Sequence, residues 1–130
     1  MSSAAAEAAT RYQQAFPGRA EEVSRVRREV AEYLGNCPVA DDLVFIVNEL
    51  AANAIVHTRS RSGSFSVRCQ LSPGRARIEV EDRGGPWRQR RNSGDRPHGL
   101  AIVQALTGPD GWGTQPTGTG GRIVWARLTW

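Results

Sequence analysis

Two runs of alternating apolar and polar side chains, at residues 64–71 and 75–81, constrain the fold of this chain most strongly. Because successive side chains of a strand point to opposite faces, each run predicts a strand with one apolar face. The Ser-Pro-Gly sequence at residues 72–74 is typical of a turn between two such strands. The apolar positions are Phe65, Val67, Cys69, Leu71, Ala76, Ile78 and Val80. The sequence therefore predicts a hairpin whose apolar face must be covered by other elements.

Predicted helices can supply that cover. Residues 20–34 and 41–57 carry apolar side chains at helical spacing, and a shorter apolar helix is expected at residues 100–106. The apolar positions of the first two helices are Val23, Val26, Val30, Leu34, Leu43, Ile46, Val47, Leu50 and Ala54. Each of these two helices can therefore bury one stripe against a sheet.

The remaining strands complete a single layer. They are expected at residues 11–16 and 122–130, with a short one near Trp112. Helices and antiparallel strands in this order predict an α+β fold, a two-layer α/β sandwich with helices on one face of a mostly antiparallel mixed sheet. A length of 130 residues fits one domain, expected over residues 11–130. Residues 1–10 are small and polar, and we expect them to be disordered.

The charge of the chain is modestly positive, at a formal +4, and all of its basic residues are arginines. The densest basic cluster is Arg88, Arg90, Arg91 and Arg96, in a segment that also contains Gly and Pro. Such a cluster can meet DNA, the phosphates of a nucleotide or an acidic partner, but a solvated loop is the simplest interpretation. Nucleic acid is therefore not the expected partner.

Targeting signals and cysteine chemistry are not evident in the sequence. No apolar run approaches the about 20 residues that cross a membrane. Residues 1–9 lack the basic start and apolar stretch of a secretory signal, so a cytoplasmic location without membrane contact is expected. Cys37 and Cys69 have no metal-binding spacing and are too few for a disulfide framework, which predicts reduced thiols.

One polar stripe runs along the helix at residues 41–57. Glu49, Asn53 and His57 follow one another at one-turn intervals beside the apolar face. For each residue alone, a hydrated helix edge is the simplest interpretation. The alternative is that a carboxylate and an amide project into a cleft, where the amide oxygen suits Mg²⁺ and the carboxylate can accept a proton. That pair is chemically suited to a polyphosphate.

Two further motifs favour the nucleotide alternative. The strand at residues 75–81 runs into Asp82 and Gly84. A carboxylate at a strand end can accept a hydrogen bond from an exocyclic amine such as that of adenine, and glycine lets the backbone approach a flat base. The same residues are also ordinary turn formers. Gly99 and Leu100 lead into an apolar helix, whose free N–H groups can bind phosphate.

Together and in this order, the motifs resemble the GHKL (Bergerat-fold, HATPase-type) ATP-binding domains. Among these, the chain is most similar to anti-sigma factor serine/threonine kinases of actinobacterial type. The similar segments are residues 16–27, 49–57, 80–86, 98–103, 112–113 and 121–128. The resemblance implies an ATP-binding anti-sigma protein that binds a sigma factor and phosphorylates a STAS-type anti-sigma antagonist, thereby regulating transcription. Members of that family are often dimers, so a homodimer is compatible with it.

The resemblance also implies roles for individual residues. Asn53 is the expected Mg²⁺ ligand, and Glu49 is the expected base that activates the attacking hydroxyl. Residues 87–97 correspond to a mobile ATP lid, and Arg25 corresponds to an arginine that faces the protein partner. The implied cofactor-binding residues are Asn53, Asp82, Gly84, His98, Gly99 and Leu100.

Two positions depart from the family pattern. Pro97 stands where a glycine is usual, and proline has no N–H to offer a phosphate. Ile123 stands where relatives often carry a threonine that helps to hold adenine. Both departures weigh against tight ATP binding and turnover. The alternative function is a non-catalytic protein-binding switch that responds to nucleotide or has lost it.

Overall fold

A computed structural model of the protein describes residues 10–57, 63–83 and 98–130. In chain order the elements are β1 (Thr10–Pro17), α2 (Glu22–Leu34), α3 (Ala40–His57), β2 (Ser64–Ser72), β3 (Arg75–Asp82), α4 (His98–Thr107), β4 (Trp112–Pro116) and β5 (Arg122–Thr129). Each expected helix and strand is present, including the short strand near Trp112, and the ends differ from the expected ones by at most two residues. Residues 1–9 lie outside the described part of the chain, so their predicted disorder stays a prediction.

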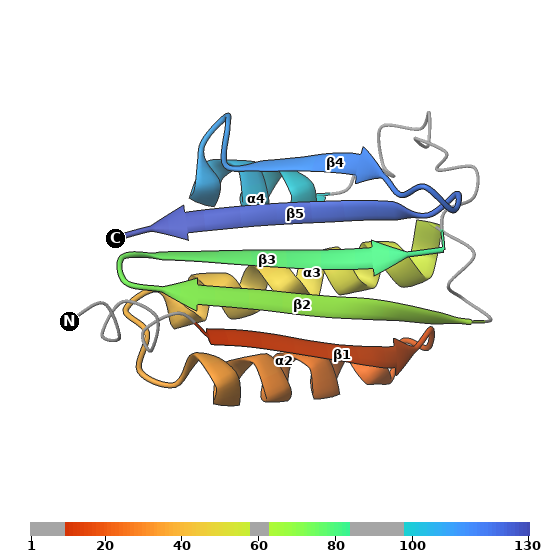
Figure 1. Cartoon of the computed structure of the whole chain (residues 1–130), viewed down its shortest axis with the longest axis horizontal. Coiled ribbons are helices and arrows are strands. Elements are labelled where there is room, and N and C mark those ends of the chain that lie inside the picture. The colour runs from red at the N-terminus through yellow and green to blue at the C-terminus, as the bar shows by residue number, and fades with distance from the viewer. Residues whose placement is uncertain (1–9, 58–62, 84–97) are drawn as a thin grey trace.

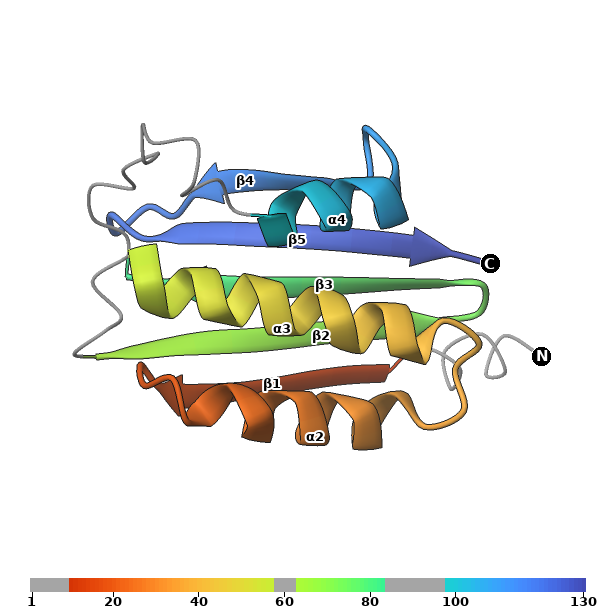
Figure 2. The same ribbon diagram turned by 180° about the vertical axis from the view of Figure 1, so that it is seen from behind.

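The strands form one sheet in the order β1-β2-β3-β5-β4. All four pairs of neighbouring strands are antiparallel, so the predicted sheet is antiparallel throughout its described strands. Helices α2, α3 and α4 lie together on one face (Figures 1 and 2). This arrangement confirms the expected two-layer α+β sandwich.

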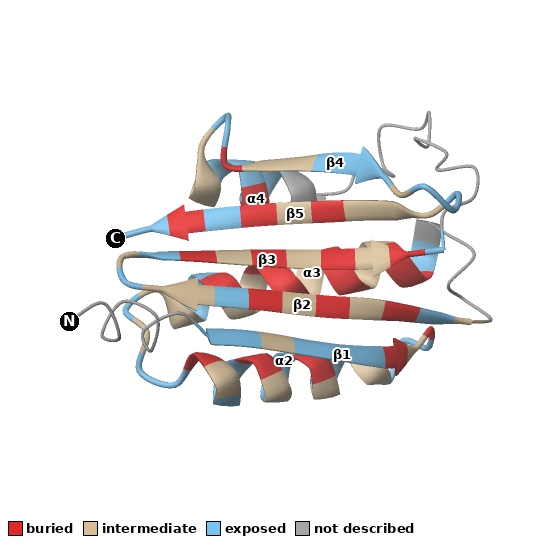
Figure 3. Cartoon of the chain, in the orientation of Figure 1, coloured by how far each residue is buried: buried red, intermediate tan, exposed pale blue. Residues whose placement is uncertain are grey.

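The core lies between the helices and the sheet. The alternation predicted for β2 and β3 is observed: along both strands buried residues alternate with more exposed ones, and only Leu71 among the predicted apolar positions is no more than half-buried (Figure 3). All five apolar positions predicted for α3 are buried, and Ala51 and Ile55 join them. α3 packs over the centre of the sheet, beside β3 and β2. Among the described residues, no helix has the length and apolar character required to cross a membrane.

Both cysteines are free thiols, in agreement with the sequence prediction. Cys69 belongs to the core, and its burial raises the pKa of the thiol to about 12. The thiol therefore stays protonated at neutral pH, where a protonated thiol is a poor nucleophile and metal ligand. Cys69 is a packing residue.

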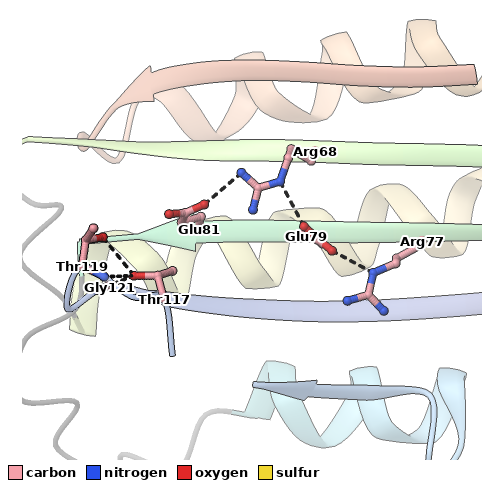
Figure 4. A network of polar contacts seen from close by, with 7 residues as sticks. All are labelled: Arg68, Arg77, Glu79, Glu81, Thr117, Thr119 and Gly121. Atoms are coloured by element: carbon pink, nitrogen blue, oxygen red, sulfur yellow. Dashed lines mark hydrogen bonds and ion pairs between the residues drawn. The ribbon is translucent and has the colours of Figure 1, made fainter. Parts of the chain in front are cut away.

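The opposite face of the sheet is polar and carries a network of ion pairs (Figure 4). Arg68 on β2 contacts Glu79 at 3.0 Å and Glu81 at 2.9 Å, both on β3. Arg77 donates a second hydrogen bond to Glu79 at 2.8 Å. The guanidinium of Arg77 also lies 4.6 Å from the ring centre of Trp125 on β5. These contacts tie β2, β3 and β5 together on the side that no described helix covers.

This network predicts a stability that falls in acid. Partial burial acts to raise the pKa of Glu79, but hydrogen bonds from Arg77 and Arg68 outweigh it and hold the pKa below its ordinary value. A carboxylate with a lowered folded-state pKa stabilises the fold above its unfolded pKa of about 4.3 and loses that contribution as the pH falls through the folded value. The free energy of unfolding should therefore be lower at about pH 3 than at about pH 7. In Glu79→Gln we expect this loss of stability in acid to be smaller by about 0.5–1 kcal/mol.

Urea unfolding followed by tryptophan fluorescence at both pH values measures this difference. Glu32→Gln, at an exposed position of α2 outside the network, is the matched control. An unchanged pH dependence in Glu79→Gln would show that the network contributes nothing to acid sensitivity.

Candidate nucleotide site

The predicted polar stripe lies on a continuous helix. α3 is helical from Ala40 to His57, so Glu49 and Asn53 lie on one face, one turn apart. Both are half-buried and flank the buried residues Leu50 and Ala54. The side chain of His57 lies outside the described part of the chain. The structure thus brings the predicted base and the predicted metal ligand together at the edge of the core.

Asn53 has an unsatisfied polar atom. Its side-chain nitrogen Nδ2 is buried and has no hydrogen-bond partner among the described residues. A buried donor without a partner destabilises the folded protein by about 1–3 kcal/mol, so such groups are usually satisfied by a protein group, an ordered water or a ligand. An amide carries both a donor and an oxygen acceptor, which fits a site that holds phosphate oxygens and Mg²⁺.

Glu49 is positioned by contacts that the sequence did not reveal. Nη1 of Arg27, on α2, donates to Oδ1 of Asn48 at 2.7 Å. Nδ2 of Asn48 in turn donates to Oε2 of Glu49 at 2.9 Å. Because the Asn48 oxygen is held by Arg27, its amide nitrogen faces Glu49. In the sequence, Asn48 stands next to Glu49, so its contact could have been anticipated. Arg27 precedes Asn48 by 21 residues, and only the packing of α2 against α3 shows that it holds the Asn48 side chain.

The predicted strand-end carboxylate is enclosed. Asp82 ends β3 and is only 4% exposed, the single buried charged side chain within the described ranges. The end of β3 and the end of α3 lie at the same edge of the sandwich (Figures 1 and 2). Asp82 therefore lies at the same end of the fold as Asn53. Gly84 lies outside the described residues, and its predicted role stays a prediction.

A tight turn before β5 closes against Asp82. The Gly121 N–H donates to Oγ1 of Thr117 at 2.8 Å, and the Thr117 N–H donates to the Gly121 carbonyl at 3.0 Å (Figure 4). A Cβ atom at Gly121 would lie 2.5 Å from the carbonyl oxygen of Asp82, closer than packed atoms allow. Glycine is therefore required for this approach, a constraint that the sequence analysis missed.

The expectation for Ile123 requires correction. In the register of β3 and β5, Asp82 is paired with Arg122, and Ile123 is paired with Glu81. Paired residues of antiparallel strands share a face, so Ile123 lies on the open face with Glu81, away from the side of Asp82. The buried residue Val124 sets this alternation. Arg122 is the β5 residue beside Asp82, and Ile123 is not a missing adenine contact on that side.

The third motif begins a helix. His98, Gly99 and Leu100 lie in the first turn of α4, although their side chains are not among those described. α4 packs against α3 and begins beside its middle (Figure 2). Pro97 and the expected lid at residues 87–97 lie outside the described residues. The roles expected for this motif stay predictions.

Arg25, the predicted partner contact, is occupied within the chain. Its Nε donates to Glu29 at 2.9 Å and its Nη1 to Glu22 at 3.1 Å, and the guanidinium lies 4.9 Å from the ring centre of Phe16. Hydrogen bonds from Tyr12 and Arg25 lower the pKa of Glu29. The Arg25 side chain keeps 38% of its surface exposed, so the predicted contact with a partner stays a prediction.

Comparisons with known proteins agree with the observed fold. A solved structure with a similar fold is that of the RsbU and RsbW domains of Rv1364c from Mycobacterium tuberculosis, with a TM-score of 0.69 and 21% identity. The match covers 92% of this chain and 32% of that one, so this chain spans about a third of that protein. No protein of curated function matches the sequence. The profile of the histidine kinase-like ATPase domain matches residues 16–122, and the protein therefore belongs to this family of ATPase domains.

Proposed function

We propose that the protein is an ATP-binding anti-sigma regulator with serine/threonine kinase activity toward an anti-sigma antagonist. The observation that carries the proposal is the half-buried pair Glu49 and Asn53, with one Asn53 nitrogen unsatisfied, at the same edge of the fold as the buried Asp82. Membership of the ATPase family supports nucleotide as the missing partner.

Each residue has a chemical task in this proposal. The Asn53 oxygen would hold Mg²⁺, which when bound neutralises charge on the phosphates. Glu49 would take the proton of a serine or threonine hydroxyl while the hydroxyl oxygen bonds to the terminal phosphorus and ADP leaves. Asp82 would accept a hydrogen bond from the adenine amine. Positioning and charge neutralisation are the main requirements of phosphoryl transfer, and these side chains can supply both.

The expected partners are a sigma factor and a STAS-type antagonist, and a homodimer is compatible with this role. The similar solved structure contains a domain called RsbW, which supports a fold suited to this role. A non-catalytic, nucleotide-responsive binding module is the competing function. Pro97 still favours it, whereas Ile123 no longer does because the register places this side chain on the open face.

A transfer assay tests the catalytic proposal. With γ-labelled ATP and the cognate antagonist, Glu49→Gln should lower label transfer at least about 100-fold while ATP binding persists, because only the base is lost. Asn53→Ala should weaken binding of Mg-ATP measured by calorimetry. The exposed substitution Gln104→Ala on α4 is the control. Transfer that survives both changes would refute the roles proposed for Glu49 and Asn53, and ATP binding by the unaltered protein without any transfer would establish the competing function.

The contacts of Glu49 predict that Asn48 and Arg27 are positioning residues. Asn48→Ala and Arg27→Met should each lower kcat about tenfold, since a misplaced base slows transfer, while the KM for ATP changes less than about twofold. Arg28→Met, the adjacent exposed position on α2, is the matched control. Equal kinetics in all three variants would remove Asn48 and Arg27 from the mechanism.

A further inference from the structure

The open face of the sheet carries a row of donors that crosses four strands. The register pairs Arg11 with Gln70, Gln70 with Arg77, and Arg77 with Arg127. We call Arg11, Gln70, Arg77 and Arg127 the arginine row. At about 4.8 Å between neighbouring strands, the row extends over roughly 14 Å. Three arginines thus share one line of the sheet register on the open face.

Two shallow hollows flank this row. One, of about 390 Å³, is lined by Arg11, Arg68 and Arg77, with Glu79 as its one acidic residue. The other, of about 570 Å³, is lined by Arg75, Arg77 and Arg127 and contains no acidic residue. Gln70 and Arg77 belong to both, so the hollows adjoin. The surface therefore offers concave, donor-rich space on either side of the row.

The positive charge of this surface is only partly neutralised. Glu79 and Glu81 are already bound by Arg68 and Arg77. Within the described residues, Arg11, Arg75 and Arg127 form no ion pair with a carboxylate. Guanidinium groups bind carboxylates through two parallel hydrogen bonds, so these three are suited to an acidic ligand.

Some of the donors are held in place before any ligand arrives. Trp125 lies beneath Arg77 and Arg127, whose guanidinium groups are 4.6 Å and 5.6 Å from its ring centre. Nη2 of Arg127 also donates to the carbonyl of Asp110 at 3.2 Å. Gly113 leaves room for the Trp125 ring, because a Cβ there would lie 2.8 Å from it. Preorganised side chains lose less conformational entropy on binding.

This surface is separate from the candidate nucleotide site. Arg77 precedes Asp82 by five residues on β3, a distance of roughly 17 Å along an extended strand. The two side chains also point to opposite faces of the sheet, since Asp82 is buried beneath the helices and Arg77 pairs with Glu79 on the open face. The arginine row is therefore not a phosphate contact of the nucleotide.

We propose that the arginine row and Arg75 form a docking surface for an acidic segment of a protein partner. Charge complementarity selects this occupant. Among the described residues, a second copy offers no free carboxylate on this face, because its Glu79 and Glu81 are paired within their own sheet. A single-stranded nucleic acid would also need a free aromatic ring on which to stack its bases, whereas the ring of Trp125 already lies beneath Arg77 and Arg127. The proposal does not depend on kinase activity.

Fluorescence anisotropy with a fluorescein-labelled octaglutamate peptide tests the proposal on the intact protein. At about 0.15 M salt, where exposed long-range attraction is screened, the protein should bind the peptide. Arg11→Gln combined with Arg75→Gln should weaken binding about tenfold. The matched control, Arg19→Gln combined with Arg28→Gln, removes the same charge from exposed positions at the turn after β1 and on α2 and should change binding less than about twofold.

Four outcomes would overturn the proposal. The first is no binding of the peptide by the unaltered protein, and the second is equal weakening in the two double variants, which would mean unspecific attraction. The third is tighter binding of a labelled oligothymidylate of equal charge through the same two arginines, which would mean a nucleic-acid surface. The fourth is a dimer in sedimentation that Arg11→Gln with Arg75→Gln dissociates, which would mean a contact between copies. Equal thermal unfolding midpoints confirm that both double variants are folded.

Discussion

The burial of the apolar face of the β2–β3 hairpin beneath α3 is the contact on which the rest of the structure depends. Val67, Ile78 and Val80 on the strands meet Ile46 and Leu50 on the helix, and all five side chains are almost completely buried. Hydrophobic burial is the dominant favourable contribution to folding, and here it is concentrated where helix and sheet cross. This packing also positions the polar residues of the candidate site, which lie on α3 and at the end of β3.

The same packing positions the side chains of the candidate site. Because Leu50 and Ala54 are anchored in the core, Glu49 and Asn53 are held half-buried at its border. α2 packs beside α3 and brings Arg27 to Asn48, which in turn contacts Glu49. A side chain that must transfer a proton benefits from such support, since a rigid neighbour limits its alternative positions. The fold thus supplies the orientation, and the side chains supply the chemistry.

The two proposed sites lie on opposite faces of the sheet. The face beneath the helices carries the core and, at one end, the enclosed Asp82. The open face carries paired glutamates and a surplus of arginines, held by Trp125 and by ion pairs. Because successive side chains of a strand point to opposite faces, Glu81 lies on the open face while its sequence neighbour Asp82 is buried on the helix-covered face. One sheet can therefore support a nucleotide site and a protein-binding surface without conflict.

The sequence by itself determined the elements, the apolar faces and the one-turn spacing of Glu49 and Asn53, because these follow from local periodicity. The tertiary structure alone decided the strand order, the contact from Arg27 to Asn48, the position of Ile123 on the open face and the alignment of Arg11, Arg77 and Arg127 in one row. Each of these depends on register or packing between segments distant in the chain. A shift of one residue in the pairing of β3 and β5 would have exchanged Ile123 and Arg122, and no local pattern specifies that register.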